Sequence, residues 1–424
     1  MSGLVIGIDV GTSGVRSIAM DGSGAVIAQA SVSMAEHGAD ANDARTWRRA
    51  SDAALHLLLA KIDAASVRAI SVDGTSGTVL PIDNEGAPLA RALMYCDAVE
   101  DPEIQSAIAA AAPLKSAARG ATSGLAKALA FKDLPSLARV LHQADWVAGN
   151  LSGRFDISDE NNALKTGYDP ALRSWPDWIR QTGLDVSVLP EVAALGAKTG
   201  NVSNEAVRTF GLSPGVIIVA GTTDGCASFL ATGADQLGDG VTALGSSLTI
   251  KLLSDRPVSA PEYGIYSHRI GDKWLAGGAS NTGGKVLAAH FSLEQIVELS
   301  ARIDPETDTG HDYYPLAKEG ERFPVADPAF MPRMSPRPAD DTEFLKAIFE
   351  GIASVEALGY HRLAELGCPP LRSVRSVGGG AVNQVWTRIR ARNLGVPMLP
   401  AQSEEAAAGA ARLALRGART EGLL

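Results

Sequence analysis

The stretch LVIGIDVGTSGVRSIAM, residues 4–20, places two short apolar runs on either side of a small, glycine-rich turn. The first run, residues 4–10, is short and β-branched, which predicts a buried strand. Residues 11–14 predict a tight turn, and residues 15–20 predict a second strand. A third strand is predicted over residues 25–30. A meander of strands therefore opens the chain, where a dinucleotide-binding unit would continue into a helix.

The rest of the chain alternates predicted strands and helices, which indicates an α/β protein. Another strand–turn–strand with a small, hydroxyl-rich turn occurs near residue 245. This repetition predicts a duplicated architecture with two domains, residues 1–222 and 223–424. Residues 303–341 are rich in proline and charge but carry four aromatic side chains, and we expect a long ordered excursion there. Further strands are expected at 67–72, 215–225, 242–253 and 374–380, helices at 47–64, 342–366 and 404–416, and a mostly helical segment at 102–150.

Composition narrows the classes of function. The chain has 424 residues with a formal net charge of -10, and 46% of the residues are hydrophobic. Such a length suits two domains of ordinary size, and the acidic balance argues against nucleic acid as a partner. The three cysteines form no CxxC pair, which favours reduced thiols in a cytosol. No signal peptide or bilayer-length apolar run is evident, so we expect a cytoplasmic protein with no membrane partner.

Residues 9–13, Asp-Val-Gly-Thr-Ser, form the first candidate site. Glycine and small hydroxyl residues let backbone N–H and side-chain O–H groups approach a phosphate closely. An aspartate at the end of the preceding strand can hold Mg²⁺. The ordinary alternative is a hairpin turn with a capping aspartate. The motif is not a Walker A loop, because GxxxxGK[ST] is absent from the sequence.

Asp224 in Gly-Thr-Thr-Asp-Gly, residues 221–225, is the second candidate. A carboxylate that follows an apolar strand at the predicted domain junction could accept a proton from a substrate hydroxyl. Taken alone, the motif favours a helix N-cap, since aspartate is a preferred cap.

Two further groups of small residues suit contact with phosphate, ribose or a planar base. They are GSS at 245–247 with GGASNTGG at 277–284, and GGGAVN at 378–383. Turn chemistry alone is the alternative for each. The polar run at 158–170 contains Asp159, and its ordinary interpretation is a solvated loop. Whether that run touches a substrate stays open.

Each of these signals is weak alone, but their order resembles that of the FGGY carbohydrate kinases, a family within the superfamily of sugar kinases, hexokinase and actin. The order is DxGTS, GTTDG, GSS, GGASNTGG and GGGAxNxxW, followed by Glu405 and the alanine-rich residues 406–411. The resemblance covers about residues 4–416. NNALKTGYDP, GGASNTGG and YYPLAKEGERFP look like the short D-ribulokinase-like members. TDG at 223–225 differs from the GDQ of glycerol kinases and the GDN of xylulose kinases.

The resemblance implies an α/β fold of two ribonuclease-H-like, actin-like domains with a central cleft. The sugar would lie mostly against the N-terminal domain and ATP in the C-terminal one. Asp224 would be the general base, Asp9 would position Mg²⁺ and the γ-phosphate, and both carboxylates would serve as metal and substrate contacts. Thr75 and Ser76 would lie by the sugar. The residues expected to contact the nucleotide or its phosphates are Gly11, Thr12, Ser13, Gly245, Ser246, Ser247, Gly278, Thr282, Gly379, Gly380 and Asn383, with Thr12 also counted as catalytic.

The expected reaction is ATP-dependent phosphorylation of the primary hydroxyl of a ketopentose, with D-ribulose giving D-ribulose 5-phosphate as the first choice. D-Xylulose, another pentose or a polyol is the alternative acceptor, because motif spacing does not fix hydroxyl stereochemistry. An ATPase switch on the same fold and a non-catalytic sugar sensor are alternatives of other classes, since fold does not imply function. A homodimer is possible within this family.

Overall fold

The computed structural model describes residues 3–424, which form two compact units. Unit 1 comprises the chain up to residue 231 together with residues 405–424, and unit 2 comprises residues 232–404. The boundary expected after residue 222 falls inside a strand, Ile217–Thr223. The C-terminal helix, expected in the second domain, packs in unit 1. An alanine-rich helical pattern carries no signal for which of two sheets it covers, so this assignment needed the structure.

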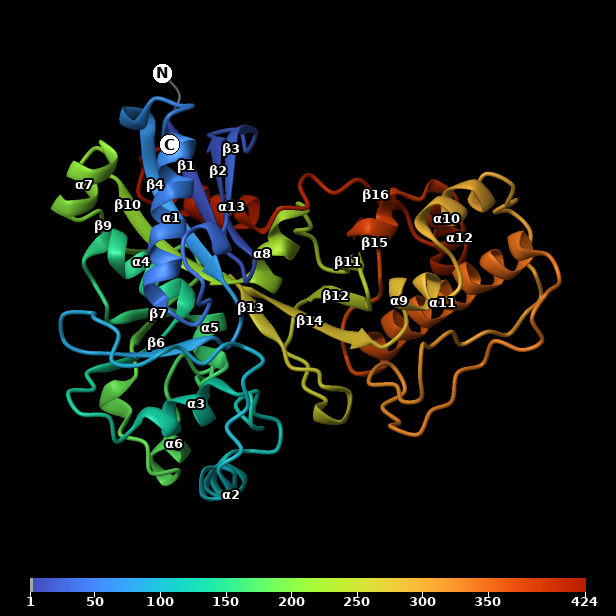
Figure 1. Cartoon of the computed structure of the whole chain (residues 1–424), viewed down its shortest axis with the longest axis horizontal. Coiled ribbons are helices and arrows are strands. Elements are labelled where there is room, and N and C mark those ends of the chain that lie inside the picture. The colour runs from blue at the N-terminus through green and yellow to red at the C-terminus, as the bar shows by residue number, and fades with distance from the viewer. Residues whose placement is uncertain (1–2) are drawn as a thin grey trace. The chain divides into compact units, whose positions relative to one another are not determined.

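Unit 1 is built on a six-stranded sheet in the order β3-β2-β1-β4-β10-β9 (Figure 1). Strands β1, β2 and β3 form the antiparallel meander expected from the sequence. Strands β4 and β10 run parallel to β1, so the carboxyl ends of these three strands meet at one edge of the sheet. The bounds are β1 (Leu4–Val10), β2 (Gly14–Asp21), β3 (Val26–Ser33), β4 (Val67–Gly74), β9 (Lys198–Asn201) and β10 (Ile217–Thr223).

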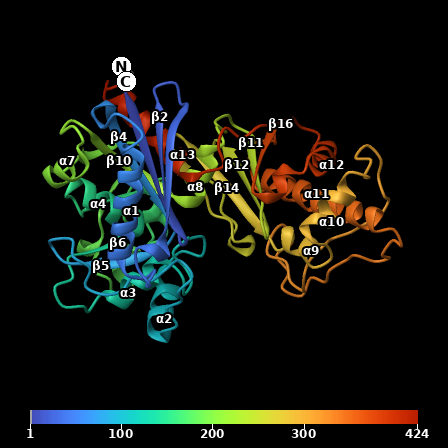
Figure 2. The same cartoon turned by 45° about the horizontal axis from the view of Figure 1, so that its top comes forward.

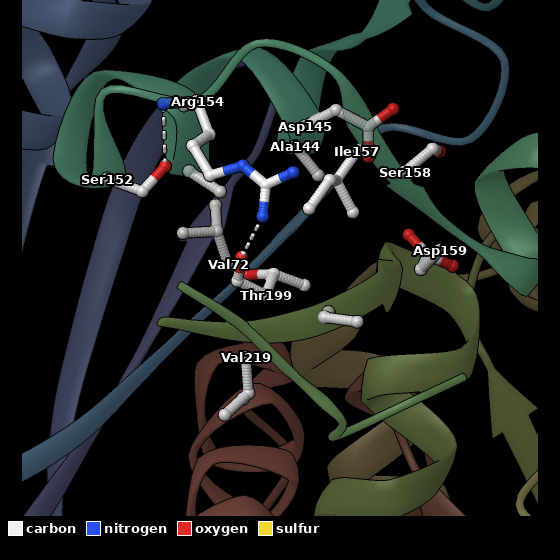
Figure 3. A pocket seen from close by; sticks show the side chains of 14 residues that line it. Val72, Ala144, Asp145, Ser152, Arg154, Ile157, Ser158, Asp159, Thr199 and Val219 are labelled. Atoms are coloured by element: carbon white, nitrogen blue, oxygen red, sulfur yellow. Dashed lines mark hydrogen bonds between the residues drawn. The ribbon is translucent and has the colours of Figure 1, made fainter. Parts of the chain in front are cut away.

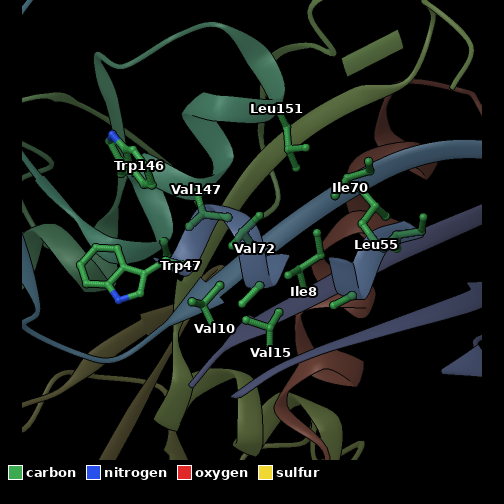
Figure 4. Close-up of a cluster of buried hydrophobic side chains, with 14 of the residues drawn as sticks. Ile8, Val10, Val15, Trp47, Leu55, Ile70, Val72, Trp146, Val147 and Leu151 are labelled. Atoms are coloured by element: carbon green, nitrogen blue, oxygen red, sulfur yellow. The ribbon is translucent and has the colours of Figure 1, made fainter. Parts of the chain in front are cut away.

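Alternate side chains of β1 enter two different cores, as the period of a strand requires. Ile6, Ile8 and Val10 pack with α1 (Ala44–Leu59) and α4 (Gln143–Ser152), a cluster drawn in Figure 4. Val5 packs with the alanines of α13 (Ala406–Thr420). Helix α13 in turn lies against α8 (Asp224–Ala231), because Gly409 allows close contact with the backbone of Ala227.

Smaller elements surround this sheet. The segment 102–150 is less helical than expected: β6 lies within it, and Gly120 has φ 101° in an irregular stretch that separates two helices. Helix α2 ends at Ala111, because Pro113 disfavours a helical backbone at the residue before it. The remaining bounds are β5 (Val79–Ile82), β6 (Arg139–His142), β7 (Ile157–Asp159), β8 (Glu191–Ala193), α2 (Pro102–Ala111), α3 (Gly124–Phe131), α5 (Glu160–Leu164), α6 (Trp178–Gln181) and α7 (Asn204–Phe210).

Unit 2 repeats the arrangement of strands on its own six-stranded sheet, β13-β14-β12-β11-β15-β16 (Figure 2). Strands β11 and β12 form the predicted second hairpin, and β15 runs parallel to β11. The predicted duplication of a strand–turn–strand is thus confirmed. The bounds are β11 (Asp239–Leu244), β12 (Leu248–Ser254), β13 (His268–Ile270), β14 (Lys273–Ser280), β15 (Ser373–Val377), β16 (Met398–Leu399), α9 (Gly284–Ala288), α10 (Leu293–Ser300), α11 (Asp341–Glu365) and α12 (Gln384–Leu394).

The proline-rich residues 303–341 contain no helix or strand of their own. Tyr313, Tyr314 and Phe323 are nevertheless buried in the core of unit 2, in keeping with an ordered excursion. Among the described residues, 3–424, no helix has the length and apolar character needed to cross a membrane.

Gly7 tests the close packing of α13 on β1. A Cβ atom there would lie 2.0 Å from the carbonyl oxygen of Ala407 and 2.2 Å from the backbone nitrogen of Ala411. We expect Gly7→Ala to lower the free energy of unfolding by about 3 kcal/mol, because neither backbone can yield without moving the helix. Urea unfolding measures the loss. Gly22→Ala, at a position with no atom within 4 Å, is the matched control, and equal losses in both variants would contradict the packing argument.

Candidate active site

Three aspartates lie where parallel strands of unit 1 end. Asp9 is near the end of β1 and pairs in register with Asp73 of β4, whose other neighbour in register is Thr222 of β10. Asp224 follows β10 directly as the first residue of α8. The carboxyl ends of parallel strands are where α/β sheets bind ligands, so this edge is the candidate active site.

Asp9 is buried and lies among charges of both signs. Burial raises the pKa of its carboxyl, the negative charge of Asp224 adds to the rise, and Asp73 and Arg16 oppose it. A guanidinium nitrogen of Arg16 lies 3.5 Å from an Asp9 oxygen, and its Nε lies 3.1 Å from a carboxylate oxygen of Glu405. Arg16 is half exposed, so it supplies positive charge beside Asp9 on the solvent side.

Asp73 is fully buried, and no N–H group within residues 3–424 donates to its carboxyl oxygens. Burial raises the pKa of Asp73 well above its usual range, and the neighbouring Asp9 raises it further. Two carboxyl groups that face each other in a buried site can share one proton, which relieves the repulsion between them. The register of β1 and β4 thus brings together two carboxyl groups whose pKa values are both raised above the usual range.

Sequence analysis passed over Asp73, although a signal for it exists. GTSG occurs twice, at residues 11–14 and 74–77, and each copy closely follows an aspartate at the end of a strand. Arg16 was missed as well, because its position on β2 opposite Asp9 depends on the register of the hairpin.

Asp224 is half buried at the N-terminus of α8, and the N–H of Gly225 donates to its Oδ1 at 2.6 Å. The positive end of the helix dipole favours the charged carboxylate at this position. Asp224 therefore starts a helix, and its carboxylate nevertheless remains partly open to solvent.

The turn that joins β1 and β2 leaves Thr12 and Ser13 exposed and Gly11 partly exposed. The backbone N–H of Gly11 donates to the carbonyl of Gly14 at 3.0 Å, which keeps the turn tight. Its small side chains and accessible backbone suit a phosphate group.

The loop at the end of β4 is held by internal hydrogen bonds. The backbone N–H and the hydroxyl of Thr75 both donate to Oε1 of Gln143, at 2.9 and 2.8 Å, and the Thr75 hydroxyl also pairs with that of Thr78 at 2.6 Å. The hydroxyl of Ser76 makes no hydrogen bond within the described chain. Of the two predicted sugar contacts, Ser76 thus has a buried hydroxyl that no group of the described chain engages, whereas the hydroxyl of Thr75 holds the loop.

In unit 2, the predicted nucleotide residues gather at the ends of β11 and β15, which are parallel neighbours. The turn at Gly245 and Ser246 is exposed, and backbone hydrogen bonds from Gly284 and Lys285 hold it. Ser247 completes the turn before β12. Gly379 is exposed and Gly380 lies against Trp386, in the turn that follows β15.

Three predicted nucleotide residues also have internal contacts in unit 2. Asn383 caps α12 by accepting from the N–H of Trp386 at 3.0 Å, and its amide donates to Ser300 at 2.8 Å. Gly278 lies under the ring of Phe323, where a Cβ atom would come within 2.5 Å. The buried hydroxyl of Thr282 donates to the carbonyl of Pro315.

The donor set suits Mg²⁺ that arrives with a nucleotide. Residues 3–424 contain no group of three or more histidine, cysteine or acidic side chains placed to hold a metal ion. Mg²⁺ in kinases is held by one or two carboxylates together with phosphates of the substrate. Asp9 and Asp224 can provide the carboxylates. Buried carboxyls with little compensating charge also favour an incoming cation.

A cavity lies beside the same strands, between β10 and α4 (Figure 3). Asp145, Ser158 and Asp159 line one side of it, and Arg154 lies near Thr199, whose carbonyl accepts from Arg154 at 2.9 Å. Burial raises the pKa of Asp145 well above its usual range, and Asp159 adds to the rise. The cavity is thus lined by carboxyl groups whose pKa values lie above their usual range.

The polar run at 158–170 differs from a solvated loop, because Ser158–Asn162 are all buried. Asp159 caps α5 by accepting from Asn161 and Asn162, and Arg173 pairs with Glu160 at 3.0 Å. The amide of Asn161 donates to Thr222 of β10 at 2.9 Å. Polar composition predicted exposure, but the hydrogen bonds of Asp159 and Asn161 hold this run in the interior and tie α5 to the strand that precedes Asp224.

Comparison with known families gives a match on both halves of the chain. Residues 4–112 match the N-terminal domain of the FGGY family of carbohydrate kinases, and residues 240–418 match its C-terminal domain. The chain is 27% identical over 295 residues to an autoinducer-2 kinase of Yersinia enterocolitica, which covers 63% of this chain and 55% of the relative. It is 22% identical to a xylulose kinase of Staphylococcus xylosus over 97% of this chain and 90% of the relative.

Solved structures show the same fold. Xylulose kinase from Rhodospirillum rubrum has a TM-score of 0.83 at 24% identity and covers 98% of this chain and 90% of its own. Glycerol kinase from Plasmodium falciparum with ADP has a TM-score of 0.82 at 16% identity and covers 100% and 92%. The predicted fold class, α/β with two actin-like domains, is confirmed.

Asp159 makes the free energy of unfolding depend measurably on pH. Burial raises the pKa of its carboxyl to about 6, so the folded state binds a proton more tightly than the unfolded state. This contribution to stability is present at low pH and is lost as the pH rises through 6. We expect Asp159→Asn to reduce the fall in the free energy of unfolding between pH 5 and pH 7.5 by about 1 kcal/mol.

Urea unfolding at pH 5 and pH 7.5 gives the slope of the free energy of unfolding against pH. Asp156→Asn, which removes a neighbouring carboxylate that is 42% exposed, should leave the slope unchanged. An identical slope in Asp159→Asn and the unsubstituted protein would contradict a protonated Asp159 at pH 5.

Proposed function

The chain belongs to the FGGY family of carbohydrate kinases, and on that premise we propose that it transfers the γ-phosphoryl group of ATP to the primary hydroxyl of a ketopentose. D-Ribulose, giving D-ribulose 5-phosphate, is the first candidate acceptor. The observation that carries the proposal is the half-buried Asp224 beside the Asp9–Asp73 pair at the ends of three parallel strands.

Asp224 acts as the general base. A sugar hydroxyl is a weak nucleophile, and a carboxylate in hydrogen-bond reach takes its proton as the new bond forms. The hydroxyl oxygen bonds to the γ-phosphorus, the bond from that phosphorus to the bridging oxygen breaks, and ADP leaves. The proton moves to the Asp224 carboxylate. The dipole of α8 keeps that carboxylate charged and ready to accept.

Asp9, Arg16 and the first turn position the phosphoryl group. Mg²⁺, when bound with ATP, neutralises charge on the phosphates, as phosphoryl transfer requires. Asp9 would hold the ion together with Asp224. Arg16 offers its guanidinium to phosphate oxygens, and Thr12 and Ser13 offer N–H and O–H donors in the turn that Gly11 keeps tight.

Unit 2 would hold the nucleotide. Gly245, Ser246 and Ser247 form its exposed phosphate turn, and Gly379 and Gly380 leave room for the adenosine. Asn383, Gly278 and Thr282 also contact other residues of unit 2, so they would help to hold the shape of the nucleotide site. Cys96, Cys226 and Cys368 are thiols and not disulfide halves among the described residues, which suits a cytosolic location.

D-Xylulose is the second candidate acceptor. The Staphylococcus xylosus relative, which aligns with 97% of this chain, is described as a xylulose kinase. An ATPase switch without a sugar substrate is the alternative of another class, and it differs in one observable: its ADP release needs no sugar.

ADP release with Mg·ATP and a panel of sugars tests the reaction. The panel contains D-ribulose, D-xylulose, L-ribulose, ribitol, glycerol and a sample without sugar. We expect turnover to require a sugar and to be fastest with D-ribulose. Faster turnover on D-xylulose would make D-xylulose the acceptor in place of D-ribulose. Equal ADP release in all samples would overturn the kinase proposal.

Asp224→Asn tests the general base. We expect kcat with the best sugar to fall by at least about 10²–10⁴-fold, because the amide cannot accept the proton. Asp133→Asn, which removes an exposed carboxylate from the same unit, should keep full activity. Near-normal turnover by Asp224→Asn would rule out Asp224 as the base.

A further inference from the structure

Lys127 is a fully buried lysine that the proposed reaction does not use. It lies on α3, and its Nζ donates to the carbonyl of Gly77 and to the carbonyl of Met94, both at 2.7 Å. These carbonyls belong to two segments that are distant from α3 in the sequence. One side chain therefore joins the helix, the loop that follows β4 and the segment around Met94.

Removing a lysine from water is unfavourable unless its charge is compensated. Burial lowers the pKa of Lys127 to about 8, while the negative charge of Asp97 opposes that change. The ammonium group is thus still charged at pH 7, and its two hydrogen bonds are charge-assisted, which makes them stronger than neutral ones. A hydrophobic side chain at position 127 would remove the hydrogen bond that Lys127 donates to each of these two carbonyls.

The loop that Lys127 holds is the one that carries Ser76. Its other fastenings are on either side of Gly77: Gln143 binds Thr75, and the hydroxyl of Thr78 accepts from the backbone N–H of Tyr95 at 3.0 Å. Gly77 itself has φ 88°, a conformation that glycine adopts readily. The carbonyl of Gly77 is consequently the point at which Lys127 fixes the backbone next to Ser76.

We propose that Lys127 is a positioning residue for the sugar: by holding the carbonyl of Gly77 it fixes the loop that presents the Ser76 hydroxyl to the acceptor. This inference rests on the proposed function and adds to it a residue that touches neither sugar nor nucleotide. Asp9 lies on β1 and Asp224 starts α8, outside the loop that Lys127 holds, so Lys127 acts on sugar affinity more than on the phosphoryl-transfer step.

A purely structural role would predict a different pattern. A lysine that only stabilises unit 1 would lower the amount of folded protein and leave the KM values of the folded fraction unchanged. A positioning role raises the KM for the sugar and spares the KM for ATP, because the predicted nucleotide residues Gly245–Ser247 and Gly379–Gly380 belong to unit 2.

Lys127→Met in the full chain tests the inference, with steady-state kinetics on whichever of D-ribulose and D-xylulose the unsubstituted protein uses faster. We expect the KM for that sugar to rise about tenfold and the KM for ATP to stay within about twofold. Lys127→Arg, which keeps the charge and the donors, should restore part of the sugar affinity.

Lys346→Met is the matched control, because Lys346 is a buried lysine of unit 2 whose Nζ donates to Thr307 at 2.8 Å. It should lower stability without raising the KM for the sugar. An unchanged sugar KM in folded Lys127→Met, or an equal rise in both KM values, would overturn the inference. Failure of both Lys127 variants to fold would overturn it too, because Lys127 would then be a stability residue alone.

The same experiment separates the inference from the function on which it rests. If the unsubstituted protein releases ADP without any sugar, the proposed function is wrong, and the inference about Lys127 is then wrong as well. If the unsubstituted protein is a sugar kinase and Lys127→Met keeps its sugar KM, only the inference is wrong.

Discussion

The repulsion among three carboxyl groups at one edge of a sheet is the constraint on which this protein's chemistry depends. Asp9, Asp73 and Asp224 are brought there by the parallel pairing of β1, β4 and β10. Burial raises the pKa values of Asp9 and Asp73, the negative charge of Asp224 adds to both rises, and that of Asp9 adds to the rise for Asp73. The half-exposed Arg16, 3.5 Å from an Asp9 oxygen, offsets part of that charge. A site with unrelieved negative charge is suited to a ligand that arrives with a cation, as a magnesium-bound nucleotide does.

The packing beneath the site keeps these carboxyls at fixed positions. Gly7 on β1 and Gly409 on α13 allow backbone contacts that a side chain would prevent, so α13 lies directly on the sheet and α8 lies directly on α13. Because Asp224 starts α8, the same packing fixes the base. Internal hydrogen bonds of Gln143 and Lys127 hold the loop after β4 in a similar way. Groups that are held in place before a ligand binds lose little conformational freedom on binding.

The sequence was informative wherever a pattern is local. Short apolar runs on either side of a glycine-rich turn predicted β1 and β2, and the repeated hairpin near residue 245 predicted the second sheet. Aspartates at strand ends identified Asp9 and Asp224 as candidates. Contacts between distant segments were not predictable: the pairing of Asp9 with Asp73 depends on strand register, and the return of α13 to unit 1 depends on tertiary packing. The burial of Ser158–Asn162 was missed because a polar composition says nothing about which side chains satisfy one another.

The central claim is that Asp224 takes a proton from a primary hydroxyl and so directs phosphate to that oxygen. The most direct measurement is the position of the phosphate in the product, by ³¹P and ¹H NMR after incubation with Mg·ATP and D-ribulose or D-xylulose. The account predicts a phosphomonoester whose phosphorus couples to the two protons of the terminal methylene group. Phosphate on a secondary or anomeric oxygen, or inorganic phosphate as the sole phosphorylated product besides ADP, would contradict it.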